Sequence, residues 1–368
     1  MQKANVALIG VGNISGIYLE NIHNVFKELR LVGVCDLVPS RAEEARRQWN
    51  IPKVYETMHD AFADPEVDIV LNLTRPHEHF EVTAKALEAG KHVYTEKPLG
   101  ASLEEGVKLR DLAQRKGLML GGAPDTFMGA GTQTCRRLID DGHIGTPIGS
   151  AAHMICRGHE GWHPDPAFYY QFGGGPMLDM GPYYLTAMIN LLGGIDRVMS
   201  ASKRSFPRRV IASEPLAGTV IDVEVSTYVA GTVRYASGAF GTLFATFDVH
   251  YPTQAKLEIF GSEGTLEVPD PNTFGGPVRL YRQGMPGFME IPLMYGYAEN
   301  SRGLGLADMS KALATGRPAR ADAQQIFHVL EAMESFEISA REERWIKLQS
   351  PYERRPAMVH PIVKGILD

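Results

Sequence analysis

The chain has 368 residues, more than a single hydrophobic core usually supports, so two domains are expected. A hydrophobic content of 44% is typical of a globular protein, and a net charge of −6 without a basic run argues against nucleic acid and anionic membranes as partners. No apolar run approaches the ~20 residues that cross a bilayer, and the N-terminus enters a strand rather than a signal peptide. The chain has three cysteines, Cys35, Cys135 and Cys156, without paired or metal-ligand spacing. This pattern fits a reducing, cytoplasmic compartment.

Residues 4–122 alternate short apolar strands with helices. Strands are expected at 6–9, 31–35, 69–72, 92–95 and 118–121, and helices at 39–49, 79–89 and 103–116. Strands and helices that alternate in this way predict a doubly wound α/β fold, with a parallel sheet covered by helices on both faces. We therefore place the first domain at residues 1–122.

A glycine-rich loop joins the first strand to the first helix. Gly10 permits a tight turn, Gly12 lets the backbone approach a pyrophosphate, and Ser15 is small enough for close helix packing. Asp36 ends the next strand, where a carboxylate binds the adenosine ribose and repels a 2′-phosphate. The pattern predicts that the loop binds a dinucleotide, and that this is NAD rather than NADP, although the nearby Arg41 leaves NADP open. The alternative interpretation is a glycine turn without a ligand, beside a surface aspartate. The loop residues expected at the cofactor are Gly10, Gly12, Asn13 and Ile14.

Two further segments follow strands of the same predicted sheet. Thr74 and Pro76 come after the strand at 69–72, and the carboxyl edge of a parallel sheet would place them near the dinucleotide. His77 and His79 are interpreted as helix-start or packing histidines. Two residues apart, they would not share a helix face, which argues against a metal pair.

Glu96 and Lys97 follow the strand at 92–95 and precede Pro98. Proline holds the residue before it extended or in a turn, and the Lys97–Pro98 bond can be cis or trans. A buried strand therefore delivers one ammonium group in a defined direction at the edge where open α/β sheets bind ligands. The alternative is that Glu96 and Lys97 only cap the strand and pair with each other.

From residue 123 onward the alternation stops, and residues 123–368 form the second predicted domain. Strands are expected at 148–156, 220–235, 239–250, 256–260, 265–268 and 278–281, and helices at 132–141, 304–314 and 323–341. Tight turns between several of these strands predict a mostly antiparallel sheet. Helices must cover one face, and the open face is available to a partner subunit.

Two stretches of this domain are rich in aromatic, glycine and polar residues. Residues 159–170 contain Trp162 and His163, which suit a polyhydroxylated ligand or, alternatively, pack as a structural loop; the same two interpretations hold for His159. Residues 173–184 contain Asp179 and Tyr183, which one helical turn would place on one face. Because a helix interior tolerates proline badly, the spacing favours a helix that begins near Pro182, with Asp179 as a capping residue.

Together, Gly10-x-Gly12, Asp36, Glu96-Lys97-Pro98 and Gly173-Gly-Gly…Asp179-x-x-x-Tyr183 resemble the glucose–fructose oxidoreductase/inositol dehydrogenase/rhizopine catabolism (Gfo/Idh/MocA) family, with the likeness continuing to the helix around His328. The resemblance implies a Rossmann domain, an open-faced sheet domain that forms dimers or tetramers, and a nicotinamide at their junction. It also implies that Lys97 and Asp179 contact substrate. A histidine commonly exchanges the proton in this family, and here its position is Tyr183, which other members also use.

The resemblance implies reversible hydride transfer between the nicotinamide and a carbinol or keto carbon of a sugar or cyclitol. Tyr183 would exchange the hydroxyl proton; the ordinary pKa of tyrosine is about 10, and the Lys97 ammonium would lower it. Lys97 would also stabilise the developing alkoxide, and it is the competing proton carrier. Trp162, His163 and Asp179 would contact the same substrate. Two other functions stay open: a redox-neutral lyase or glycosidase that retains NAD, and a dinucleotide sensor without enzymatic activity.

Overall fold

The structure is a computed structural model that describes residues 3–359, 363–365 and 367–368. The chain divides into two compact units, which are described separately. Unit 1 comprises Met1–Ala130, Met294–Phe327 and Pro356–Asp368, and unit 2 comprises Gly131–Leu293 and His328–Arg355. Unit 1 is thus assembled from three separate stretches of chain, whereas the sequence analysis expected a single break after residue 122.

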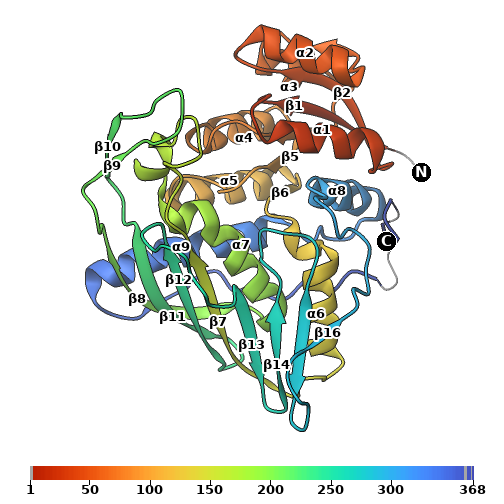
Figure 1. Cartoon of the computed structure of the whole chain (residues 1–368). Helices are drawn as coiled ribbons and strands as arrows, with labels where there is room; N and C mark the ends of the chain where they lie inside the picture. Colours follow the sequence, from red (N-terminus) through yellow and green to blue (C-terminus); the bar gives the residue numbers. More distant parts are fainter. Residues whose placement is uncertain (1–2, 360–362, 366) are drawn as a thin grey trace. The chain divides into compact units, whose positions relative to one another are not determined.

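Unit 1 contains a six-stranded parallel sheet with the order β3-β2-β1-β4-β5-β6, which confirms the predicted fold class (Figure 1). Its strands are β1 (Ala4–Ile9), β2 (Leu29–Cys35), β3 (Lys53–Val54), β4 (Ile69–Asn72), β5 (His92–Thr95) and β6 (Leu120–Gly122). Its helices are α1 (Ser15–Asn24), α2 (Pro39–Trp49), α3 (Met58–Ala63), α4 (His79–Glu88), α5 (Leu103–Lys116) and α8 (Leu304–Thr315). All four residues of β4 are buried, as expected of a parallel strand covered on both faces.

The register of this sheet brings several predicted site residues to one edge. Ile9 is the partner of both Cys35 and Asn72, and Asn72 is the partner of Thr95. Parallel strands in this register end together, so the segments after β1, β2, β4 and β5 start side by side. These segments begin with Gly10, Asp36, Leu73 and Glu96.

Unit 2 contains a nine-stranded sheet with the order β16-β15-β14-β13-β7-β12-β11-β8-β17 and a separate β10-β9 ribbon. Its strands are β7 (Pro147–Ile155), β8 (Ile195–Lys203), β9 (Arg208–Val210), β10 (Val220–Asp222), β11 (Tyr228–Tyr235), β12 (Phe240–Thr246), β13 (Leu257–Gly261), β14 (Gly264–Val268), β15 (Val278–Arg282), β16 (Met289–Ile291) and β17 (Ile346–Lys347). The β12–β7 pair is parallel and the other pairs in the sheet are antiparallel, which confirms the mostly antiparallel prediction. The single strand predicted at 220–235 is wrong, because β10 and β11 belong to different sheets.

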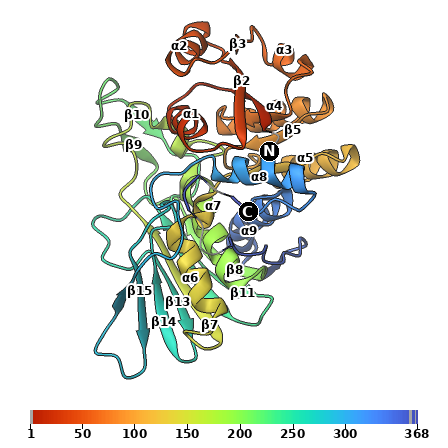
Figure 2. The same cartoon turned by 90° about the vertical axis from the view of Figure 1, so that its right-hand side faces the viewer.

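Helices cover one face of this sheet: α6 (Ala130–Asp140), α7 (Gly175–Leu192) and α9 (Ala323–Glu342). Figure 2 shows α6, α7 and α9 on the same side of the strands. Contacts join α7 to β7, β11 and β12, and Ser200 in β8 donates a hydrogen bond to the Phe336 carbonyl of α9. Residues that alternate to the other face are more exposed, including Met199 in β8 and Phe240 in β12.

The predicted start of the helix near Pro182 is wrong. Helix α7 begins at Gly175, has Pro176 in its first turn and contains Pro182 in its interior. Asp179 therefore lies inside the helix rather than at its cap. The helix is buried along nearly its whole length from Gly181 onward, and this tertiary packing compensates for the backbone hydrogen bond that Pro182 cannot donate.

Candidate active site

The glycine loop of unit 1 has the backbone conformation that the sequence pattern requires. Gly10 has a φ of +95°, and a Cβ atom there would lie 2.8 Å from the Leu73 carbonyl oxygen. A Cβ added at Gly12 would meet nothing within 4 Å, so the backbone is open at this position. Ser15 closes the loop by donating a 2.7 Å hydrogen bond from Oγ to the Gly12 carbonyl. A glycine is needed at position 10, and the open backbone at Gly12 fits the close approach of a pyrophosphate.

Asp36 joins the end of β2 to this loop. Its Oδ2 accepts a 2.6 Å hydrogen bond from the Val11 backbone, and its Oδ1 accepts a 2.8 Å bond from the Val38 backbone. Each carboxylate oxygen can accept a second hydrogen bond, so the side chain is oriented while it retains capacity for ribose hydroxyl groups.

The segment after β4 is held by Asn72 and His79. Asn72 Oδ1 accepts hydrogen bonds from the backbone and the hydroxyl of Thr74, the latter at 2.7 Å. His79 is buried, with Nδ1 2.7 Å from the Pro98 carbonyl and Nε2 3.0 Å from the Thr74 carbonyl. Burial lowers the pKa of His79. These contacts fit the packing role expected for this histidine, and Pro76 opens a short 3₁₀ helix at the same edge (Pro76–Glu78).

The Glu96 carboxylate is held by hydrogen bonds from within unit 1. Its Oε1 accepts a 2.7 Å hydrogen bond from the Tyr18 hydroxyl, and its Oε2 accepts a 3.0 Å bond from the backbone of Lys97. The Lys97–Pro98 peptide bond is cis. Glu96 is buried, so its carboxylate fixes the backbone that carries Lys97 at the carboxyl edge of β5.

Asp125 is a buried acid in unit 1 that the sequence analysis did not identify. Its Oδ2 accepts hydrogen bonds from the backbones of Gly303 and Gly305, at 2.9 and 3.0 Å. Burial raises the pKa of Asp125 to about 6. Its partners lie more than 170 positions along the chain, so no local pattern could have revealed it.

In unit 2, residues 156–174 form an aromatic loop. The rings of His159 and Tyr169 are stacked with centroids 3.9 Å apart, and the Trp162 and His163 rings meet edge to face at 5.4 Å. Trp162 is 63% exposed, so its ring is available for contact with a ligand. The loop is a cluster of rings that pack on one another, with the Trp162 ring at its exposed side.

Asp179 and Tyr183 lie one turn apart on α7, which places them on one face of the helix. Tyr183 is buried, and the Asp179 side chain is 14% exposed. Nε2 of His159 lies 3.4 Å from Oδ2 of Asp179, so the aromatic loop and α7 meet at this carboxylate.

A buried ion cluster supports the aromatic loop, and the sequence analysis did not identify it. Arg209 in β9 donates a 2.6 Å hydrogen bond to Glu160 and a further bond to Asp248. Tyr170 donates a hydrogen bond to the same Glu160 carboxylate. Burial, with a smaller contribution from this hydrogen bond, raises the pKa of the Tyr170 hydroxyl. An arginine in a three-residue strand carries no local signal of such a role.

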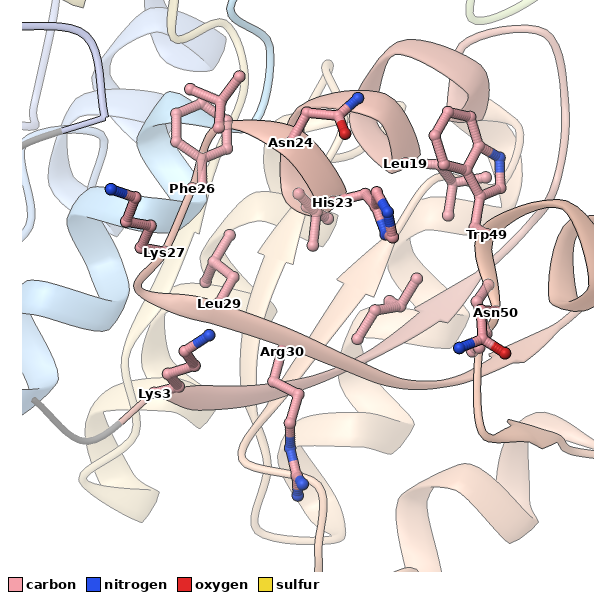
Figure 3. A pocket seen from close by; sticks show the side chains of 14 residues that line it. Lys3, Leu19, His23, Asn24, Phe26, Lys27, Leu29, Arg30, Trp49 and Asn50 are labelled. Carbon is pink, nitrogen blue, oxygen red and sulfur yellow. The ribbon is translucent and has the colours of Figure 1, made fainter.

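No group of three or more potential metal ligands occurs among the residues that the structure describes. In the same described part of the chain, no helix is long and apolar enough to cross a membrane. A hollow of about 360 Å³ in unit 1 lies beside the starts of β1 and β2 and the end of α1, and it is lined by residues that include Lys3, His23 and Trp49 (Figure 3). These are the amino ends of the strands, and none of the predicted site residues lines this hollow.

Comparison with known proteins identifies both parts of the chain. Residues 4–122 match the model of an oxidoreductase family with an NAD-binding Rossmann fold, and residues 132–267 match the C-terminal domain model of the same family. The chain is 24% identical to myo-inositol 2-dehydrogenase of Thermotoga maritima, over 71% of this chain and 74% of that one. It is 27% identical to scyllo-inositol 2-dehydrogenase (NAD(+)) of Bacillus subtilis, over 72% and 73%.

A solved structure of levoglucosan dehydrogenase in complex with NADH and levoglucosan is similar to this chain with a TM-score of 0.80. The sequence identity is 22%, and the match covers 95% of this chain and all of that one. The two matched models together span most of the sequence, and this protein belongs to the Gfo/Idh/MocA family of oxidoreductases, with an NAD-binding Rossmann domain at residues 4–122.

Proposed function

We propose that this protein is a dehydrogenase that transfers a hydride between a nicotinamide cofactor and a carbinol or keto carbon of a sugar, a sugar derivative or a cyclitol. The observation that carries the proposal is the ordered edge of the parallel sheet, where Gly10, Asp36 and Lys97 are each held by defined contacts. Relatives named as inositol dehydrogenases, and the fold neighbour solved with NADH and levoglucosan, support a cyclic polyol as the substrate class.

The cofactor proposal is NAD, bound by residues at the carboxyl edge of the sheet. The open backbone at Gly12 would approach the pyrophosphate, and the oriented Asp36 carboxylate would accept ribose hydroxyl groups and disfavour a 2′-phosphate. Bound NAD supplies the hydride acceptor. The residues proposed to contact it are Gly10, Gly12, Asn13, Ile14, Asp36, Thr74, Pro76, Glu96 and Lys97.

The proposed catalytic residues are Lys97, Asp179 and Tyr183. When a carbinol carbon loses its hydride, its hydroxyl oxygen must lose a proton and become a carbonyl. An ammonium at that oxygen stabilises the negative charge that develops there, which is the role proposed for Lys97. The proton passes either to Tyr183 as the phenolate, with Lys97 as the ammonium throughout, or to Lys97 as the neutral amine, which thereby becomes the ammonium that stabilises the oxygen. Both assignments stay open. Asp179 accepts a hydrogen bond from a substrate hydroxyl, and Trp162 and His163 pack against the apolar face of the ring.

The open face of the unit 2 sheet is the proposed surface for association into a homodimer or homotetramer. Tyr228 and Phe244 pack edge to face on it, and Lys203 lies over the Tyr228 ring. Exposed apolar side chains such as Phe240 would be buried when a second subunit binds this face. The three free cysteines support a reducing, cytoplasmic location. In the domain assignment that we propose, residues 1–122 bind the cofactor, while residues 123–368 bind substrate and associate.

The decisive experiment titrates the purified protein with NADH and NADPH by fluorescence, and then follows the reduced-nicotinamide absorbance with a panel of sugars, cyclitols and keto-sugars. We expect NADH binding and turnover with at least one cyclic polyol, and Lys97→Ala should abolish turnover while the NADH affinity stays nearly unchanged. A Lys97→Ala variant with the wild-type rate would contradict the catalytic assignment. Tight binding with substrate consumption but no net absorbance change indicates the redox-neutral lyase or glycosidase, and binding without any conversion indicates the sensor.

A further inference from the structure

An aspartate–histidine pair in unit 2 joins Asp179, one of the proposed catalytic residues, to His159, which has no role in the proposed function. His159 Nε2 in the aromatic loop is 3.4 Å from Asp179 Oδ2 on α7. The His159 and Asp179 side chains are 11% and 14% exposed, so little water screens the pair. Catalytic hydrogen bonds are often long in ligand-free structures and shorten when substrate binds.

The His159 ring is held in one orientation from several sides. It stacks on Tyr169 with the ring planes 18° apart, and it meets the edge of Phe247 at 4.7 Å between centroids. The His159 backbone donates a 3.1 Å hydrogen bond to the Tyr170 hydroxyl, which in turn donates to Glu160. Because these contacts determine the ring plane, the direction in which Nε2 faces Asp179 is determined as well.

A histidine that only filled this space would destabilise the fold more than an apolar ring of similar size. Nδ1 of His159 is buried and has no hydrogen-bond partner among the residues that the structure describes, and a buried unpaired polar atom is destabilising. The packing histidine His328 differs, since its Nε2 accepts a hydrogen bond from Ile195 and its Nδ1 lies 2.7 Å from the Ser350 carbonyl. A phenyl ring at position 159 would keep the stacking without the unpaired nitrogen, so packing alone does not account for a histidine at this position.

We propose that His159 is a positioning residue for Asp179, whose carboxylate it holds through the Nε2–H group in the orientation that receives a substrate hydroxyl. The inference rests on the proposed function, because Asp179 is taken to contact the substrate. It adds a specificity determinant: the aromatic loop and α7 recognise one hydroxyl together, so the fit of that hydroxyl depends on both elements.

Two conservative substitutions separate positioning from packing. The side-chain amide nitrogen of glutamine reaches the place of Nε2, whereas that of asparagine reaches only the place of Nδ1. His159→Asn should therefore lower kcat/KM about 100-fold, which is the loss that a misplaced reacting group produces. The loss in His159→Gln should be smaller by a factor of at least about ten. The affinity for NADH should be the same in both variants, and His143→Asn, in a turn of the same unit, serves as the control for removal of an imidazole.

A double-mutant cycle with Asp179→Asn tests the pairing directly. We expect Asp179→Asn to lower both kcat/KM and the melting temperature less in the His159→Asn background than in the wild-type background. Equal losses in His159→Asn and His159→Gln, wild-type activity in both, or strictly additive effects in the cycle would each overturn the proposal. The melting temperatures require no substrate, so the pair can be tested even if no panel member turns over and the proposed function fails.

Discussion

Arg209 is the buried cation that neutralises two carboxylates beneath the aromatic loop, so Arg209→Met is expected to destabilise unit 2. The Arg209 side chain is 3% exposed, and those of Glu160 and Asp248 are 12% and 5% exposed. Methionine retains most of the apolar bulk but removes every hydrogen-bond donor. Asp248 would then remain buried without the cation, and Glu160 would keep only its ion pair with Arg157, whose side chain is 42% exposed.

Removal of one partner from a buried ion pair costs about 3–5 kcal/mol of stability, because the remaining charge is uncompensated. For a unit of 150–250 residues each kcal/mol lowers the melting temperature by about 2–4 °C, which gives a fall of roughly 6–20 °C. Thermal unfolding followed by circular dichroism measures this change. Tryptophan fluorescence should report loss of order in the aromatic loop, which contains Trp162.

Arg282→Met is the matched control, because Arg282 forms an ion pair with Glu263 in which both side chains are largely exposed. Exposed pairs contribute about 0–1 kcal/mol, so this variant should unfold close to the wild-type temperature. If Arg209→Met is as stable as Arg282→Met, the ion cluster does not support the loop and the reasoning from burial is wrong.

Three further predictions concern the cofactor, pH and association. Asp36→Ala should narrow the preference for NADH over NADPH in fluorescence titrations, because the carboxylate that repels a 2′-phosphate is gone; tighter NADPH binding by the unmodified protein would contradict this. The raised pKa of Asp125 means that the folded state binds the Asp125 proton more tightly than the unfolded state does. The stabilisation of the fold by this proton is therefore complete below pH 3.8 and is lost as the pH rises through about 6. That loss is about 3 kcal/mol, and Asp125→Asn should remove this slope from the melting-temperature profile, whereas an unchanged slope would assign it to other groups. Phe240→Glu should lower the molar mass measured by light scattering if the open sheet face forms the interface, and an unchanged oligomer would exclude that part of the face.

Much of unit 1 could be predicted from local sequence. The short apolar run at 69–71 is typical of a strand in a sheet that is covered on both faces, and the glycine at position 10 has a φ that other residues adopt at a cost. Asp36 and Lys97 could be placed at the carboxyl edge because they are the first and the second residue after a strand, respectively. The spacing of apolar residues and the residue types in turns are properties of neighbouring residues in the chain. These assignments therefore need no knowledge of the tertiary structure.

Only the tertiary structure decided which residues interact across long stretches of chain. Proline argues locally against a helix through position 182, yet the burial of α7 outweighs that local cost. Arg209 meets Glu160 and Asp248, and His159 meets Asp179, because the sheet and α7 bring distant segments together. Charged and polar side chains have the same local patterns on a surface as in a buried cluster, and their roles are determined by the desolvation that folding imposes on them.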